Sequence, residues 1–204
     1  VFESRFSNKI IPDFFTNDNQ IIYSNLSGYA IARGISSEIF LKIHKIPLKI
    51  SANTTILDVS NFKENTLGEN TKSQQLLAEK YSIKWSLNYT FEKLGLELVY
   101  AATNYGPIRL PLLENDFRPE YSLPYTIHNV KLSKNFNNGW STFLGLRNFT
   151  NFTPPKYSIL RANDPFDQNI NDPINNPEGY TFDASYMYAS FQGINIVFGG
   201  SFVF

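Results

Sequence analysis

The stretch from Tyr81 to Phe91, YSIKWSLNYTF, alternates without fault between apolar and polar residues. Successive side chains of a strand point to opposite faces of its sheet, so the alternation predicts a strand with one wholly apolar face. Strands of globular sheets most often have about 5–6 residues, whereas a tilted membrane-spanning strand has about 9–11. This segment is therefore long for a soluble sheet and has a suitable length for a membrane strand.

Similar alternating segments follow one another along the chain, joined by links of two kinds. After EKLG (92–95), Leu96, Leu98 and Tyr100 resume the apolar positions, which predicts a hairpin. Short links also fall at 44–47 and 135–139, whereas long polar links occupy about 12–22, 61–79, 104–124 and 151–181. We expect eight antiparallel strands, near residues 1–11, 28–43, 47–60, 80–92, 94–104, 124–134, 139–150 and 183–204.

Short turns that alternate with long loops are typical of an outer-membrane β-barrel, whose short turns face the periplasm and whose longer loops face outward. Aromatic residues make up 16% of the chain and charged residues only 18%. Aromatic side chains favour headgroup depth, so they predict two membrane girdles near the strand ends. The expected girdle residues are Tyr81, Trp85, Tyr100, Trp140, Phe202 and Phe204, with Tyr29, Phe91 and Tyr125 as further members.

Composition excludes several other classes of protein. No stretch approaches the roughly 18 consecutive apolar residues of a membrane helix. The net charge is zero and the basic residues are scattered, so we expect no nucleic-acid partner. The chain has no cysteine, which excludes disulfides and thiolate sites. A soluble antiparallel sandwich, which also alternates apolar and polar residues, stays open as the alternative fold.

Three segments resemble the C-terminal part of TonB-dependent outer-membrane receptors, in the style of those of the Bacteroidetes. They are SGYAIARG (27–34), the stretch from Asn104 to Pro155 that contains LGLRNFTNF, and the stretch from DPFD (164–167) to the terminal Phe204. The resemblance implies a plugged barrel of about 22 strands, of which residues 1–204 would be the last third. The plug domain and the TonB-contacting segment would lie upstream of this chain.

Eight strands can also close a barrel by themselves, with an interior filled by side chains. The expected lumen positions Ser82, Ser86, Ala101 and Ser201 are small for that purpose, so we favour the larger barrel.

The resemblance implies a multi-pass protein of the outer membrane that imports a scarce nutrient, most often an iron–siderophore complex, into the periplasm. Its expected partners are TonB, the plug domain, membrane lipid and the transported molecule, and no cofactor is expected. We expect no enzyme, because His44 and His128 lack companions for a triad or a metal site. The alternatives are a non-catalytic barrel that docks a surface lipoprotein or scaffolds an envelope complex, which the long 151–181 link favours, and a small outer-membrane enzyme or adhesin.

The loop YGPIRLPLLENDFRPEY offers candidate ligand contacts. Arg109 and Arg118 can grip carboxylate or phosphate groups bidentately, and Tyr105, Phe117 and Tyr121 offer apolar contact area. The favoured alternative is that both arginines pair with the nearby acids Glu114, Asp116 or Glu120 and merely fold the loop.

A second loop, from 161 to 180, is rich in carboxylate and amide oxygens. Asp164, Asp167 and Asp172 are weak candidates for a calcium site, with Asn169 and Asn175 as neighbours. Their spacing matches no EF-hand, and Pro and Asn turns in a solvated loop explain the same composition. We therefore expect no metal.

Overall fold

The computed structural model describes residues 1–14, 22–64, 69–112, 118–136, 138–155, 172–174, 177 and 188–203. Over these residues the protein is all-β, with a single 3-10 turn, η1 (Glu92–Leu94). None of the helical structure in this part of the chain is long and apolar enough to cross a membrane. The strands are β1 (Phe2–Ser7), β2 (Ile10–Asp13), β3 (Ile22–Asn25), β4 (Gly28–Ile43), β5 (Leu48–Glu64), β6 (Asn70–Gln74), β7 (Tyr81–Phe91), β8 (Leu96–Tyr105), β9 (Tyr125–Asn135), β10 (Trp140–Arg147) and β11 (Asn195–Phe202).

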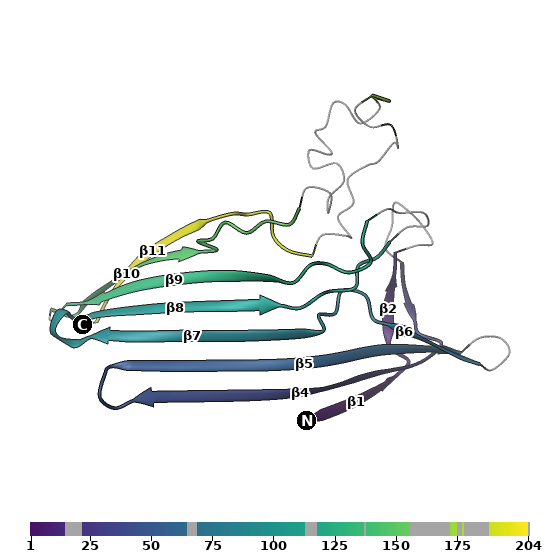
Figure 1. Ribbon diagram of the computed structural model, residues 1–204, viewed down its shortest axis with the longest axis horizontal. Coiled ribbons are helices and arrows are strands. Elements are labelled where there is room, and N and C mark those ends of the chain that lie inside the picture. Colours follow the sequence, from purple (N-terminus) through teal and green to yellow (C-terminus); the bar gives the residue numbers. More distant parts are fainter. Residues whose placement is uncertain are drawn as a thin grey trace.

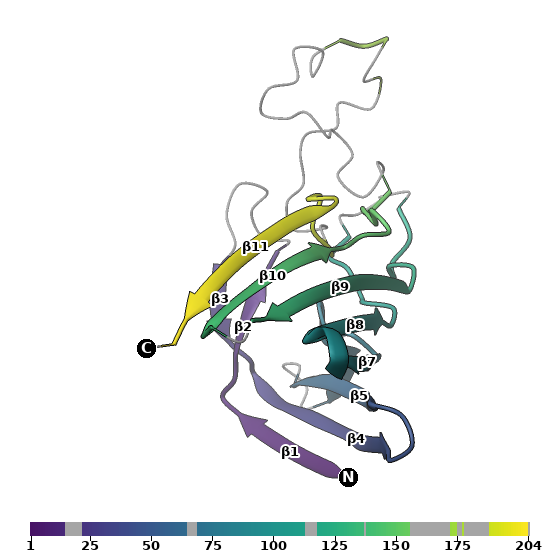
Figure 2. The ribbon, with the colours of Figure 1, turned by 90° about the vertical axis from the view of Figure 1, so that its left-hand side faces the viewer.

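One curved antiparallel sheet dominates the fold (Figures 1 and 2). Its order is β1-β4-β5-β7-β8-β9-β10-β11, with β6 paired to the end of β5, and β2 and β3 form a separate hairpin. The short turns lie together at one end of the sheet, shown at the left of Figure 1, and the long connections lie at the other. Strands β1 and β11 do not pair with each other, so this sheet stays open and does not form a closed eight-stranded barrel.

The eight predicted strands correspond to β1, β4, β5, β7, β8, β9, β10 and β11 of the main sheet, and their boundaries differ at both ends of the chain. The first segment is not one strand over 1–11, because Asn8 adopts a left-handed conformation (φ 55°) that ends β1 and lets the chain restart as β2. Strand β5 continues to Glu64, four residues beyond its predicted end at 60, because β4 and β6 both pair with that extension. Among the described residues after 187, the last strand begins only at Asn195.

The pairing register separates the strand residues into two faces. Opposed residues of antiparallel strands share a face; Leu87, for example, opposes Ile50 and Tyr100. We call the side that carries Leu87 the apolar face, and its large hydrophobic and aromatic side chains are Tyr29, Ile31, Ile35, Ile39, Leu41, Ile43, Leu48, Ile50, Ile56, Phe62, Tyr81, Ile83, Trp85, Leu87, Tyr89, Phe91, Leu96, Leu98, Tyr100, Val130, Leu132, Trp140, Leu144, Leu146, Ile196, Phe198 and Phe202.

The apolar face is not covered by any other described part of the chain. Ile39 is 55% exposed, Leu144 is 52% exposed and Phe198 is 83% exposed. In a soluble sandwich such residues would pack against a second sheet. In the described part of the molecule the buried hydrophobic residues are instead few: Leu26, Ala30, Val59, Ala102 and Leu110. A face of this kind marks a surface that meets lipid or another apolar body.

The opposite side of the sheet, which we call the polar face, satisfies its side chains laterally. The hydroxyls of Ser51 and Ser86 lie 2.7 Å apart, and the Asn88 amide donates to Glu97 over 2.6 Å. Its charged residues are six cations, Lys42, Lys49, Lys63, Lys84, Lys131 and Arg147, against two acids, Glu38 and Glu97. Four exposed aromatic residues, Phe2, Phe6, Phe40 and Phe143, interrupt this pattern.

Gly95 allows the hairpin between β7 and β8. Its φ of 59° lies in the left-handed region, and its N–H donates to the Glu92 carbonyl over 3.2 Å. A Cβ here would lie 2.7 Å from the Asn135 carbonyl oxygen, so a larger residue would push β9 away. The sequence prediction of a tight turn at 92–95 is therefore confirmed, with glycine as its structural cause.

Candidate functional site

The loop end of the polar face brings residues of four strands together. Strand β8 ends at Tyr105, β9 begins at Tyr125 and β10 ends at Arg147, so antiparallel pairing places all three at one edge of the sheet. Tyr105 opposes Tyr125 directly, and Arg147 opposes Asn195 of β11. Tyr125 therefore lies on the polar face, and its predicted place in a lipid-facing girdle is wrong.

An aromatic stack forms one wall of this site. The Tyr105 and Tyr125 rings lie 4.8 Å apart at 19°, and Phe152 stacks on Tyr125 at 4.7 Å and 7°. The Tyr125 hydroxyl donates to the Tyr188 carbonyl over 3.2 Å. Each such ring pair contributes about 0.5–1.5 kcal/mol beyond area burial, so the stack is a preformed wall that offers the face or edge of a ring to a ligand.

Asn148 fixes the chain that carries Phe152. Its amide donates to the Phe152 carbonyl over 2.7 Å and its Oδ1 accepts the Phe152 N–H at 2.9 Å. Its own N–H donates to Asn129 Oδ1 over 3.0 Å. Asn148 is buried and adopts φ 50°, a conformation that Asn tolerates better than most residues. Asn148, the first Asn of LGLRNFTNF, therefore holds in place the segment that carries Phe152 of the aromatic wall.

Two adjoining cavities open beside the wall. One, of about 350 Å³, has in its lining Tyr105, Tyr125, Asn129 and Arg147, with Ala189, Ser190, Gln192, Gly193 and Asn195 from the segment that leads into β11. The next, of about 320 Å³, shares Asn129 and Arg147 and adds Lys131. Neither lining includes Asp or Glu among the described residues.

Arg147 is the main unneutralised charge of this site. Its side chain is exposed, and across the ranges that the structure covers it takes part in no ion pair. A guanidinium with free donors beside aromatic rings suits an anionic group attached to a planar or apolar one. The joined cavities therefore have the chemistry of a binding site.

The loop residues predicted to bind ligand form a separate cluster. Arg109 Nε donates to Glu120 Oε1 over 2.7 Å and its Nη1 to the Gln74 carbonyl over 2.9 Å. The Tyr121 hydroxyl donates to Gln74 Oε1 over 2.8 Å, and Lys80 lies 4.0 Å from the Tyr121 ring centroid. For Arg109 the loop-folding alternative is what the structure shows, because its guanidinium ties the loop to β6.

The remaining predicted ligand contacts have different outcomes. Tyr105 lines the cavity beside Arg147, whereas Arg118 is only 3% exposed, and Phe117 lies outside the described residues. Ligand contact by these residues stays a prediction. The structure brings Tyr105 together with Tyr125, Phe152 and Arg147, none of which the sequence had singled out for binding.

One acid lies at the base of these loops, where the chain enters β7. The backbone of Glu79 forms an isolated antiparallel β-bridge with Ile108. Burial raises the pKa of its carboxyl, and the nearby Lys84 ammonium partly opposes that rise. Glu79 therefore carries a desolvation cost when it is ionised.

Of the predicted calcium ligands, Asp164 and Asp167 lie outside the described residues. Asp172 accepts the N–H of Ile174 over 2.8 Å, as in an Asx turn. Among the residues that the structure describes, no group of three or more His, Cys, Asp or Glu could hold a metal ion.

Apart from Tyr125, the predicted girdle residues that are described lie on the apolar face: Tyr29, Tyr81, Trp85, Phe91, Tyr100, Trp140 and Phe202. Trp140 and Phe202 contact each other at 5.0 Å near the short turns. Tyr100 shares a hydrogen bond of 2.8 Å with His128 Nδ1, which explains that histidine structurally. Phe204 lies outside the described residues, and the girdle role itself stays a prediction.

Comparison with known proteins bears on the fold. No protein-family model matches the sequence, and no curated protein matches it. The structure is similar to that of the ferric-catecholate import receptor Fiu of E. coli K12 in its closed form, with a TM-score of 0.53 and 14% identity. The match covers 74% of this chain and 20% of that receptor. At this identity the likeness shows a shared fold alone, and this chain spans about a fifth of that receptor's length.

Proposed function

We propose that residues 1–204 are the C-terminal part of the barrel, of about 22 strands, of a TonB-dependent outer-membrane receptor. The receptor would import a scarce nutrient, in our proposal an iron–siderophore complex, into the periplasm without covalent chemistry. The plug domain and the segment that contacts TonB would belong to other parts of the protein. The fold shared with Fiu supports this class.

The uncovered apolar face is the observation that carries the proposal. It extends across the sheet from Ile35 on β4 to Phe198 on β11, and polar groups lie behind it. Lipid hydrocarbon would cover such a face without a desolvation cost. The edges of β1 and β11 that have no partner strand expose backbone N–H and C=O groups, and in a membrane no water can form hydrogen bonds with these groups. Further strands must therefore pair with both edges. Both requirements are met if the sheet is one sector of a larger barrel.

The polar face supports the choice of cargo. Arg147 and Lys131 line the joined cavities together with Tyr105 and Tyr125, and no acid lines them among the described residues. An anionic metal chelate with planar groups would find both a charge partner and a stacking wall there. Fiu, whose fold is similar, is an import receptor for ferric catecholate, and cargo of that chemistry would fit these cavities.

The proposal is tested with the intact protein, by measuring binding of ferric siderophores of different charge. Arg147→Gln removes charge-assisted hydrogen bonds of about 1.5–3 kcal/mol, so affinity for an anionic chelate falls by about tenfold to a hundredfold. Lys63→Gln, the same charge change on β5 of the polar face, leaves affinity unchanged.

Three outcomes would contradict different parts of the proposal. Equal affinity of Arg147→Gln and the parent protein would remove the site. Failure to bind any ferric siderophore would remove the cargo. Absence from the outer-membrane fraction would remove the class, and a surface lipoprotein that co-purifies in equal amount would favour the docking role instead.

A further inference from the structure

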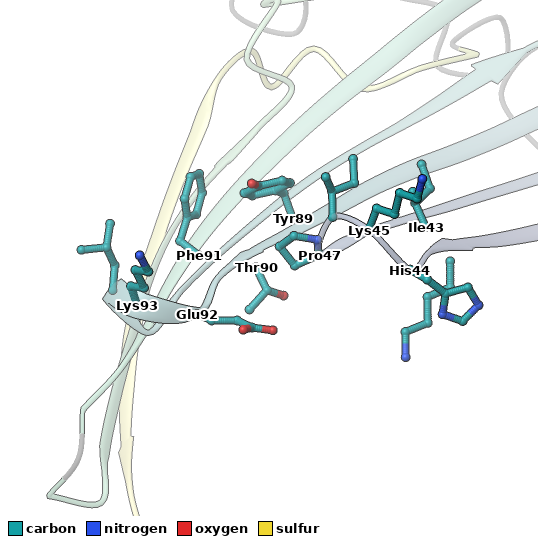
Figure 3. A pocket seen from close by; sticks show the side chains of 12 residues that line it. Ile43, His44, Lys45, Pro47, Tyr89, Thr90, Phe91, Glu92 and Lys93 are labelled. Carbon is teal, nitrogen blue, oxygen red and sulfur yellow. The ribbon is translucent and has the colours of Figure 1, made fainter.

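A groove lies at the short-turn end of the sheet, far from the loops. It has a volume of about 780 Å³ and is bounded by the turn that joins β4 to β5 and by η1 after β7 (Figure 3). Its lining combines basic and apolar residues: Lys42, His44, Lys45 and Lys93 with Ile43, Ile46, Pro47, Tyr89, Phe91 and Leu94, besides Thr90 and Glu92.

Two of the basic residues of the groove and its one acid lie on opposite sides of the ribbon. Figure 3 shows Lys45 and Lys93 on the same side of the ribbon as Tyr89 and Phe91, which belong to the apolar face. Glu92 extends to the opposite side, so it does not neutralise them there. The apolar face therefore has Lys45 and Lys93 beside this groove, and Lys134, which opposes Leu96, is a third cation of that face at the same end of the sheet.

These two lysines of the groove have no acidic partner in the described part of the chain. Within the described ranges, Lys45 and Lys93 make no ion pair. Apolar side chains beside them are open to the surroundings, since Ile46 is 44% exposed and Leu94 is 55% exposed. The groove thus offers two ammonium groups on the same side as exposed apolar side chains.

We propose that this groove binds the headgroup of an anionic phospholipid from the leaflet at the short-turn side. The headgroup would lie in the groove, which has Lys45 at one end and Lys93 at the other, and the acyl chains would run along Tyr89 and Phe91 on the apolar face. A soluble anion would use the lysines and leave the apolar residues uncovered, whereas a phospholipid satisfies both. This inference rests on the proposed membrane location of the apolar face.

The test uses the intact protein in detergent, titrated with short-chain phosphatidylglycerol or phosphatidylcholine and followed by native mass spectrometry. Phosphatidylglycerol is expected to bind in preference. Two lysines at an anionic headgroup contribute enough that Lys45→Gln with Lys93→Gln weakens phosphatidylglycerol binding about thirtyfold and leaves phosphatidylcholine unchanged.

Two further variants control for charge and for folding. Lys63→Gln with Lys72→Gln removes the same charge from the long-loop end and keeps the parent affinity. Lys45→Arg with Lys93→Arg keeps the cations and retains binding. Equal binding of the two lipids, or no loss in the Gln variant, would overturn the inference. A protein that inserts into vesicles without lipid preference contradicts this inference alone, whereas one that inserts into no vesicle contradicts the proposed function.

Discussion

The two faces of the sheet belong to the same strands and differ in how their side chains are satisfied. On the polar face, serine and asparagine side chains find partners in neighbouring strands, as Ser141 does with Ser201 at 2.7 Å. On the apolar face, Leu132 opposes Leu98 and Leu144, and all three stay at least one-third exposed. Many side chains of the polar face thus find partners within the sheet, whereas the apolar face has no covering layer in the described part of the chain.

This difference explains why the chain has so small a core. Burying apolar surface contributes about 25 cal/mol per Å², and a soluble domain gains this inside itself. In this protein the corresponding free energy is gained only when another apolar phase or surface covers the apolar face. A thin sheet with one dry and one wet side is suited to a boundary between hydrocarbon and water.

The largest expected difference between the two faces comes from introducing a charge on each of them in turn. Leu87→Arg, in the middle of β7 on the apolar face, should lower the free energy of unfolding in lipid vesicles by about 2–4 kcal/mol. Ala101→Arg, one residue from the partner of Leu87 and on the polar face, should change it by less than about 1 kcal/mol, because that side chain enters an open cavity. Urea unfolding in vesicles measures both. Equal losses would mean that the apolar face is not exposed to lipid.

A smaller effect is expected where the polar face meets its loops. Asn148→Ala removes two side-chain hydrogen bonds to Phe152, which should cost about 1–3 kcal/mol and loosen the aromatic wall. Limited proteolysis after residue 148 and the affinity for cargo report this change.

Two variants separate the causes of that loss. Asn148→Gly keeps the left-handed backbone at φ 50° and loses only the hydrogen bonds. Asn138→Ala, at the short-turn end, loses one exposed bond of 3.4 Å and should leave cleavage unchanged. If Asn138→Ala were the more damaging, the proposed anchor would be wrong.

Most of the long strands could be predicted from the sequence because alternation of period two survives in them. From Tyr81 to Phe91 the pattern has no exception, and the predicted faces are those observed. Strand β6, NTKSQ, has no such pattern, and it forms because Ser60 to Glu64 of β5 offer it a partner. Pairing of that kind depends on residues brought together by the fold, which a local pattern does not contain.

The candidate site was harder to predict for the same reason. Strand β9 carries apolar residues on both parities, such as Ile127 and Val130, so its sequence does not decide the face of Tyr125. The register with Tyr105 decides it. Arg147 stands within the quoted motif LGLRNFTNF, but only its pairing with β11 shows that it reaches the cavity. By contrast, the Arg109–Glu120 pair was foreseeable because both residues belong to one loop.

The smallest expected effect concerns the edge of the sheet at Glu79, where the two faces give way to loops. Because burial raises the pKa of this carboxyl above its ordinary value of 4.5, the protonated form stabilises the fold below that value, and this stabilisation is lost as the pH rises through the folded-state pKa. Glu79→Gln cannot ionise, so its melting temperature should exceed that of the parent at pH 7 and match it at about pH 4. Glu120→Gln, which breaks the ion pair with Arg109, should show no gain at pH 7. A melting-temperature difference between Glu79→Gln and the parent that stayed constant with pH would show that the carboxyl is solvated at the loop end, and that the sheet edge there is as wet as the polar face.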